Sequence, residues 1–521
     1  MKKTKDERTM NRRNKCTTNE KIKSSFLHSF ILSFSLMLSL LVVACSDYES
    51  FSDNPNYRLE FSHDTIAFDT LISTIPSSTK TLYAFNNNNN GMRISTIQLE
   101  KSTESRFRVN VDGRFLLDGI WHDFEVLKHD SLIIRIEMTP PEVGSTEPLY
   151  FEDKLHFTLE NGAKQTVVLT GGSIDAYIQK GGMIIEDNTT LLTDKAYVIY
   201  DSLVVKKDAT LTLTEGTTLM FHDKAALHVY GKLLIEGSME KPVVLRGDRM
   251  DHMFDYLRYD NTPSRWEGII IHRGSYGNKL FQCDLHSSRF GIICEDTEQT
   301  TPDESMPSVT LDCCILHNIG GDGLQLNNCV SKVTNTQISN TLGHTVNIYG
   351  GCHTFIYCTL AQFYPFTSKI GNALHLSSAQ EGDTYGLLRK AHFINCVITG
   401  YGDDVIMGEN IPQDGSSSYL FHHCFLNTPE VNDAEHFVNN IFDRDKKENE
   451  DKKLVRQDNF TLFDTENFLY DFTPKEESLI RSLADPNYAD IPTVDRKGIN
   501  RLADEGPDAG CYEYVAPPSN D

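Results

Sequence analysis

The chain has little positive charge for its length. Its 521 residues include 49 Lys and Arg against 73 Asp and Glu, which gives a formal net charge of −24 at pH 7. Residues 1–44 hold nine of the basic and three of the acidic residues, so the remainder has 40 basic and 70 acidic residues, a net charge of −30. Nucleic-acid binders carry basic surfaces. We therefore expect no nucleic-acid partner and no electrostatic capture of an acidic polysaccharide.

Long apolar runs are absent after residue 44. In the second half of the chain the apolar runs are three to six residues long and alternate with period two, which is typical of strands and not of helices. The signatures G-x-S-x-G, Walker A and a catalytic Cys–His pair are also missing. The chain is thus predicted to be all-β, and none of these common catalytic motifs assigns it an activity.

Six segments of the second half align with one another. They read LFQCDLHS, LDCCILHN, VTNTQISN, FIYCTLAQ, FINCVITG and FHHCFLNT, at intervals of 31, 22, 22, 38 and 28 residues. The shared column holds Cys283, Cys314, Thr336, Cys358, Cys396 and Cys424. Repeats of about this length, built of short strands and turns, are typical of solenoids. We predict a right-handed parallel β-helix over residues 177–440, with one coil per repeat and like side chains stacked inside.

The cysteines have two readings. In an exported protein, cysteines usually form disulfides. Neighbouring strands of a sheet are about 4.8 Å apart, but stacked side chains that point the same way give poor disulfide geometry. We therefore expect mostly free, buried thiols, and the cysteines outside the column are not assigned.

The N-terminus has the pattern of an export signal. Lys21 and Lys23 precede an apolar stretch from Phe26 to Ala44, and Cys45 follows directly. A basic segment, an apolar segment and a small residue before the break describe a signal peptide over 1–44. The order Val-Val-Ala-Cys resembles a bacterial lipobox, which implies a lipidated Cys45, a tether over 45–57, attachment to the lipid bilayer, and an outer-membrane location on the periplasmic face or the cell surface. A transmembrane anchor that ends in Cys is the alternative.

Residues 58–176 change to longer alternating strands separated by turn signals, which predicts an antiparallel β-sandwich. Stretches such as FSHDTIAFDT, FRVNVDG and DSLIIRIEMTP resemble the immunoglobulin-like domain that follows the lipid anchor in many Bacteroidota surface lipoproteins. That resemblance implies a spacer or docking module without chemistry of its own.

The next segment resembles the opening coils of pectate-lyase-like β-helices. The matching stretches are residues 211–218, 227–237 and 241–243, followed by Trp266-Glu267-Gly268-Ile269. Residues 441–521 are predicted to be an irregular C-terminal capping region, with a short helix over 474–485. The residues that resemble the ending of related β-helix lipoproteins are Asp495, Gly498, Arg501, Asp508, Gly510, Tyr512 and Glu513.

One turn position of the repeat carries most of the candidate catalytic residues. It holds Phe290, Asp322, His344, Asn372 and Asp404. Stacking would place Asp322 and His344 about 5 Å apart, and Asp322 and Asp404 about 14 Å apart. The longer distance exceeds the separation of a glycosidase carboxylate pair. Asp and Asn are also common at turns for structural reasons, because their side chains bond to the nearby backbone.

Asp403 and Asp404 together resemble the double aspartate of polygalacturonase-type β-helices. The partner motifs of that family, N-T-D, G-H-G and R-x-K, are absent. The sequences around Asp322 and Asp403 lack the multi-oxygen spacing of a Ca²⁺ loop. We therefore expect no metal or cofactor. If the chain were a polysaccharide lyase, Ca²⁺ is the ion that it would commonly use.

Three insertions, 295–308, 377–390 and 408–418, fall at the same turn of the predicted coils. Insertions at one turn project from one edge of a solenoid and wall a groove. Tyr385, Arg389 and Tyr419 lie in or beside them and, with Asn372, are the candidate ligand-binding residues. Aromatic side chains there suit either sugar rings or plain loop packing.

These patterns leave two functions open. The first is a lipid-anchored envelope protein that binds a glycan or a protein partner without catalysis. The alternative is a polysaccharide lyase or glycoside hydrolase that acts at the loop-walled edge. A fold alone does not choose between them.

Overall fold

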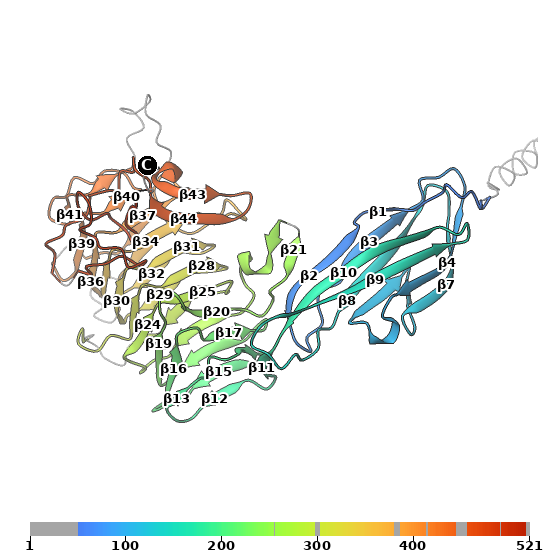
Figure 1. Ribbon diagram of the computed structural model, residues 1–521. Coiled ribbons are helices and arrows are strands. Elements are labelled where there is room, and N and C mark those ends of the chain that lie inside the picture. The colour runs from blue at the N-terminus through green and yellow to red at the C-terminus, as the bar shows by residue number, and fades with distance from the viewer. Residues whose placement is uncertain are drawn as a thin grey trace, which may run out of the picture. The chain divides into compact units, whose positions relative to one another are not determined.

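The chain is all-β in its computed structural model and divides into two compact units (Figure 1). The structure describes residues 50–254, 256–296, 303–379, 386–412, 415–443, 456–489 and 491–516. The predicted signal peptide and Cys45 lie outside these residues. Across the described ranges, no helix has both the length and the apolar character needed to span a membrane.

An antiparallel sandwich of two five-stranded sheets forms the N-terminal part. The first sheet has the order β1 (Glu60–Phe61), β3 (Lys80–Phe85), β8 (Ser131–Met138), β5 (Phe107–Val111) and β6 (Arg114–Phe115). The second has the order β2 (Thr65–Ile72), β10 (Lys164–Ile174), β9 (Leu149–Leu159), β4 (Met92–Leu99) and β7 (Ile120–Val126), and a short 3-10 turn, η1 (Ser102–Glu104), follows β4. Residues 50–57, expected in the tether, begin against this sandwich, where the Gly91 amide donates to the Ser50 carbonyl at 2.9 Å.

Three parallel sheets follow, and successive coils add one strand to each. The 11-stranded sheet contains β11 (Ala176–Gln179), β14 (Ala196–Ile199), β17 (Thr218–Phe221), β20 (Val243–Gly247), β25 (Cys283–His286), β28 (Ile315–Ile319), β31 (Gln337–Thr341), β34 (Thr359–Gln362), β37 (Val397–Gly400), β40 (Phe425–Leu426) and β42 (Ile441–Phe442). The 9-stranded sheet contains β12 (Met183–Ile185), β15 (Ser202–Val205), β18 (Ala226–Val229), β23 (Gly268–Ile271), β26 (Ile292–Cys294), β29 (Leu324–Asn327), β32 (Val346–Tyr349), β35 (Leu374–Ser377) and β38 (Ile406–Glu409).

The 10-stranded sheet contains β13 (Thr189–Thr190), β16 (Thr210–Thr214), β19 (Lys232–Glu236), β24 (Asn278–Phe281), β27 (Val309–Asp312), β30 (Val330–Thr334), β33 (Gly351–Ile356), β36 (Leu388–Ile394), β39 (Ser418–His422) and β41 (Phe437–Val438). These strands lie directly before the cysteine column and are the third strand of each coil, whereas the sequence repeat had singled out two. The predicted fold class, an antiparallel sandwich followed by a parallel β-helix, is confirmed.

The cysteine column is stacked and internal, as predicted. Asp284 pairs with Ile315 and Val397 with Phe425, so the residues before them share one register. The Cys358 amide donates to the Cys396 sulfur at 3.4 Å, and the Cys396 amide to the Cys424 sulfur at 3.4 Å. All ten cysteines among the described residues are free and buried, so the expectation of free thiols is confirmed.

The residue before each column position turns the chain sharply. Positive φ values of 46–56° recur there in six successive coils, at Gln282, Cys313, Asn335, Tyr357, Asn395 and His423. We call these six residues the left-handed corner. Asn tolerates this conformation better than most residues, whereas Tyr and Cys adopt it at a cost. The corner joins the 10-stranded sheet to the 11-stranded sheet.

The C-terminal segment covers one flank of the solenoid. We call residues 456–516 the tail; it contains η3 (Arg456–Asn459), β43 (Phe460–Asp464) and β44 (Leu469–Pro474). Outward residues of the 11-stranded sheet pack with it into a second apolar core, made of Ala361, Phe363, Val397, Phe425, Phe460, Phe472, Ile480, Ala509, Cys511 and Tyr512.

The left-handed corner also holds the tail. Gln282 donates to the Arg496 carbonyl at 3.2 Å, Asn335 to the Val494 carbonyl at 3.1 Å, and Asn395 to the Asp485 carbonyl at 3.1 Å. The tail therefore runs back along several coils. The helix expected over 474–485 does not form and that prediction is wrong, because contacts with the sheet and the corner hold this segment in turns.

Candidate functional site

The repeated turn position, which we call the turn column, holds Phe290, Asp322, His344, Asn372 and Asp404. Its residues are stacked from coil to coil as the repeat predicts. Asp322 Oδ1 accepts the His344 backbone N–H at 2.7 Å, and Asp322 Oδ2 accepts the Asn347 side-chain amide at 2.7 Å. Both carboxylate oxygens therefore have partners. Asp322 thus holds two neighbouring residues in position on the next coil.

His344 continues this chain of contacts. Its Nδ1 accepts the Asn372 backbone N–H at 3.0 Å, and its ring stacks on His375 with centroids 4.7 Å apart. Burial lowers the pKa of His344, against the opposing effect of Asp322. His344 is therefore a neutral acceptor at pH 7.

Asp404 lies three strands away from Asp322. The register runs from Leu324 through Val346 and Leu374 to Ile406, a separation of about 14 Å. Asp404 Oδ1 accepts the Thr428 hydroxyl at 2.8 Å and the Ile406 amide at 3.3 Å. Asp403 is exposed beside it. The structure does not bring Asp322 and Asp404 together.

Polar side chains line the outer face of the 9-stranded sheet. Gln325, Asn347 and His375 point outward in register on β29, β32 and β35, and we call these three residues the polar row. His375 Nδ1 lies 2.9 Å from Asn347 Oδ1. Beside the row, Tyr349 is 39% exposed and pairs in register with Asn327. Amide, imidazole and phenol groups thus lie together on one face.

The three predicted insertions do share one turn. They connect β26 to β27, β35 to β36, and β38 to β39, all between the 9-stranded and 10-stranded sheets. The second insertion closes on the face at Tyr349, since a Cβ on Gly386 would lie 2.6 Å from the Tyr349 hydroxyl oxygen. Lys390 Nζ lies 2.8 Å from the Glu304 carboxylate of the first insertion. The second insertion therefore borders the face beside Tyr349, and the first insertion is linked to it through Glu304 and Lys390.

The candidate ligand-binding residues are dispersed. Asn372 is in the turn column, Arg389 lies near the start of β36, and Tyr385 lies outside the described residues. The Tyr419 ring stacks on His436 with centroids 3.9 Å apart, and its hydroxyl donates to Asp433 at 3.4 Å. The ring face of Tyr419 is thus used in loop packing.

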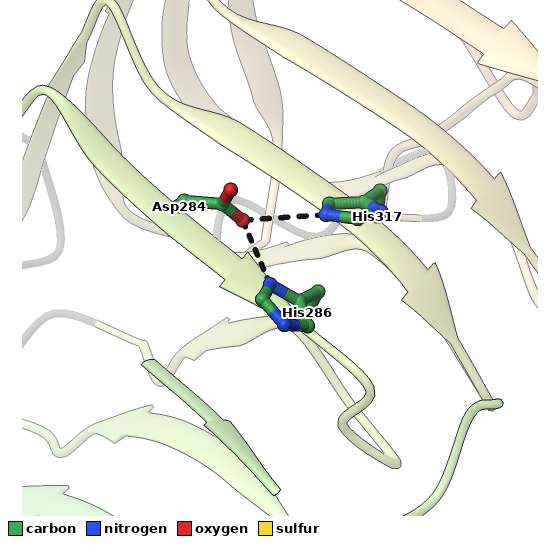
Figure 2. A group of neighbouring side chains, drawn as sticks. All are labelled: Asp284, His286 and His317. Carbon is green, nitrogen blue, oxygen red and sulfur yellow. Dashed lines mark hydrogen bonds and ion pairs between the residues drawn. The ribbon is translucent and has the colours of Figure 1, made fainter. Parts of the chain in front are cut away.

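Sequence reasoning missed a second cluster, on the outer face of the 11-stranded sheet (Figure 2). Asp284 Oδ1 lies 2.9 Å from His286 Nδ1 and 3.3 Å from His317 Nε2. His286 Nε2 in turn lies 3.0 Å from Asp260 Oδ1, and Arg246 pairs with Asp260 at 2.7 Å. Five polar groups from β20, β25, β28 and the 248–266 insertion meet here.

The charges of this cluster depend on one another. Burial disfavours the charged form of His286, but Asp284 and Asp260 outweigh it and raise the pKa of His286 to about 9. Burial also opposes ionisation of Asp284, but the two histidines hold its pKa well below the usual value. The repeat held a signal for this cluster, since LFQCDLHS and LDCCILHN place His286 and His317 at the same position and alternation places Asp284 on their face.

The comparisons with known proteins give no identity. No family model and no curated protein matches the chain. Among solved structures, PapD-like domain 7 of human CEP192 is 14% identical, with 24% of this chain and 91% of that chain covered and a TM-score of 0.17. A GH87 α-1,3-glucanase from Streptomyces thermodiastaticus is 10% identical, with 70% and 88% covered and a TM-score of 0.20. A family 123 glycoside hydrolase from Clostridium perfringens is 7% identical, with 28% and 30% covered and a TM-score of 0.18. At TM-scores below 0.5, these likenesses do not bear on what the chain does.

Proposed function

We propose that the protein is a lipid-anchored component of the cell envelope whose solenoid binds an extended neutral glycan along the polar row without cleaving it. The observation that carries this proposal is the register of Gln325, Asn347 and His375 on three adjacent strands. Because neighbouring strands are about 4.8 Å apart, the hydrogen-bonding groups of the row recur at about that interval. A linear polymer with hydroxyl groups on every ring can meet such a row at successive positions.

The chemistry of this face favours a neutral ligand. Two carboxylates border the row: Asp322 accepts the Asn347 side-chain amide at 2.7 Å, and His375 Nε2 is 3.6 Å from the Glu409 carboxylate. The formal net charge of −30 over residues 45–521 adds to this field. A uronate polymer would be repelled, whereas neutral sugar hydroxyls can donate to carboxylates and can both donate to and accept from amides and imidazoles. Tyr349 supplies an exposed aromatic ring for stacking.

Binding without cleavage is favoured by the state of the carboxylates. Both oxygens of Asp322 accept hydrogen bonds from within the chain, and Asp404 is bonded to Thr428. A glycosidase needs two carboxyl groups within about 5–9.5 Å across the scissile bond. Asp322 and Asp404 are about 14 Å apart by strand spacing. The lyase or hydrolase alternative therefore has less support, and the experiment below separates the two.

Anchoring through Cys45 rests on the sequence pattern at residues 21–45. Metabolic labelling with a fatty-acid analogue tests it separately from glycan binding. We expect label on the wild-type chain and none on Cys45→Ala, with the uncleaved precursor accumulating. Label that persists on Cys45→Ala contradicts the anchor.

The glycan proposal is tested with the full chain, purified in detergent, against immobilised neutral and uronate-containing polysaccharides. We expect saturable binding to a neutral polymer. Asn347→Ala and His375→Ala should each weaken it by roughly 2- to 12-fold, the range for one neutral hydrogen bond of about 0.5–1.5 kcal/mol. His392→Ala, on the 10-stranded sheet, is the matched control and should bind as wild type.

Two outcomes contradict the proposal. If no neutral polymer binds, or if the polar-row variants bind as well as wild type, the row is not a glycan site. New reducing ends or unsaturated products that disappear in Asp322→Ala or Asp404→Ala would establish the enzymatic alternative instead.

A further inference from the structure

We propose that Asp284, His286 and His317 form a binding site for a divalent transition metal ion of the Zn²⁺ type. The site lies on the outer face of the 11-stranded sheet and is distinct from the polar row on the 9-stranded sheet. Neither proposal depends on the other.

The three ligand atoms already converge. One atom from each residue lies within 4.8 Å of the others, and Figure 2 shows both rings directed at the Asp284 carboxylate. Asp284 Oδ1 is 2.9 Å from His286 Nδ1 and 3.3 Å from His317 Nε2. Zn²⁺ bonds to nitrogen and oxygen are near 2.0–2.2 Å, so neighbouring ligands of a tetrahedral ion are about 3.3–3.6 Å apart. An ion would require the observed contacts to open by only a few tenths of an ångström.

The surroundings of His286 are those of a metal ligand. Its other nitrogen, Nε2, lies 3.0 Å from Asp260, which is itself paired with Arg246 at 2.7 Å. Metal-bound histidines almost always donate their second ring N–H to a carboxylate or carbonyl, which fixes the tautomer and the ring orientation. With one proton held on Nε2 by Asp260, a metal ion would displace the Nδ1 proton that Asp284 now accepts, and Nδ1 would become the ligand atom.

The backbone of the cluster is rigid. Asp284 and His286 lie on β25 and His317 on β28, in adjacent register. The buried Trp266 donates its indole N–H to the His286 carbonyl at 2.9 Å. Sites carried by strands are held more precisely than sites on loops. The ligands are therefore positioned before an ion arrives.

The site is open on one side. The side chains of Asp284 and His317 are each 27% exposed, whereas that of His286 is 9% exposed. Three protein ligands with a solvent-facing fourth position is the arrangement of exchangeable and catalytic zinc sites, in contrast to closed structural sites. The fourth position would accept water or an oxygen or nitrogen atom of a ligand.

A hydrogen-bonded cluster that merely fixes the 248–266 insertion is the competing explanation. That role needs His286, Asp260 and Arg246, which link the insertion to the sheet. His317 comes from the next coil and directs a second nitrogen at the oxygen that His286 already contacts. A metal site requires this third ligand, and docking of the insertion does not.

The test titrates Zn²⁺ into the chelator-treated full chain in detergent, by calorimetry, with Co²⁺ as an optical probe of coordination geometry. We expect one equivalent to bind at this site with visible Co²⁺ bands. His317→Ala should remove that equivalent. Asp260→Asn should weaken binding by roughly 10- to 100-fold, the effect of losing the group that orients a metal-bound histidine.

Two controls make the result specific. His375→Ala, on the other face, should keep the equivalent. His423→Ala removes a ligand from the other histidine cluster, formed with His422 and Asp485, and should also leave this equivalent intact. Stoichiometry and affinity that are unchanged in a folded His317→Ala chain, or no Zn²⁺ binding by wild type, would overturn the proposal.

Discussion

Replacing Arg501 with Ala should free the tail from the solenoid. Arg501 is 2% exposed and pairs with the buried Glu513. It also donates to Asn335 Oδ1 at 2.7 Å and to the Gly510 carbonyl at 3.2 Å, and its guanidinium lies 3.6 Å from the Tyr357 ring centroid. Two of these contacts, Asn335 and Tyr357, belong to the left-handed corner. One side chain thus joins the corner to the tail.

The size of the effect follows from the charge left behind. Breaking a buried ion pair by removing one partner costs about 3–5 kcal/mol. Burial raises the pKa of Glu513 to about 8 even though Arg501 opposes this. At this pKa the carboxyl group is already largely neutral at pH 7, and removing Arg501 would raise the pKa further, so Arg501→Ala leaves no bare buried charge. We therefore expect a loss near the lower end, about 3 kcal/mol.

The assay combines urea unfolding with limited proteolysis of the native chain. Stacked repeats can open locally, so the tail should become protease-sensitive well before the coils unfold. Arg501→Met with Glu513→Leu should recover most of the loss, because an apolar pair replaces the ion pair. The control is Arg289→Ala, whose side chain is 59% exposed in its pair with Glu267 and which should change stability by less than about 1 kcal/mol. An Arg501→Ala chain with a protected tail and wild-type stability would refute the reasoning.

Three further predictions concern the pH dependence of stability, the reactivity of the buried thiols and the effect of replacing Gly386. Burial lowers the pKa of His353 to about 4, so as pH falls the unfolded chain takes up a proton on this histidine before the folded chain does. About 3 kcal/mol of stability should therefore be lost between pH 6.5 and 4. In His353→Gln the midpoint of urea unfolding should fall less steeply over this pH range. Burial raises the pKa of Cys396 and Cys424, so a thiol reagent should modify them only after denaturation. Gly386→Ala should cost about 1 kcal/mol from its φ of 78° and also weaken glycan binding by displacing Tyr349.

Each of these has a distinguishing control. Wild type and His353→Gln with the same pH slope would mean that His353 is not the titrating group. Rapid modification of native Cys396 or Cys424 would contradict the internal column. Gly415→Ala shares a positive φ of 82° but meets no atom within 4 Å, so it should lose stability without losing glycan affinity.

The repeat of the solenoid could be predicted from the sequence, whereas the position of the tail that covers its flank could not. The cysteine column and the shared turn of the insertions could be predicted because each recurs at a fixed place in the repeat. The Asp322–His344 contact followed from the same stacking. The tail could not be placed, because Arg501 and Asn335 are 166 residues apart and no local pattern links them.

The second cluster shows a different limit. His286 and His317 occupy the same repeat position, so their proximity was readable from the alignment of two segments. Asp260, however, comes from the insertion after β20, whose path over the sheet depends on packing around Trp266 and Ser287. The three proposed ligands could thus have been predicted from the sequence, whereas Asp260, which orients His286, could not.

Hydrogen exchange of the full chain, with and without a saturating neutral glycan, tests the central claim most directly. If the polar row is the binding site, protection should rise at β29, β32 and β35 and at the neighbouring insertions, and the glycan should be recovered intact. Protection confined to the 10-stranded or 11-stranded sheet, or recovery of cleaved glycan, would contradict it.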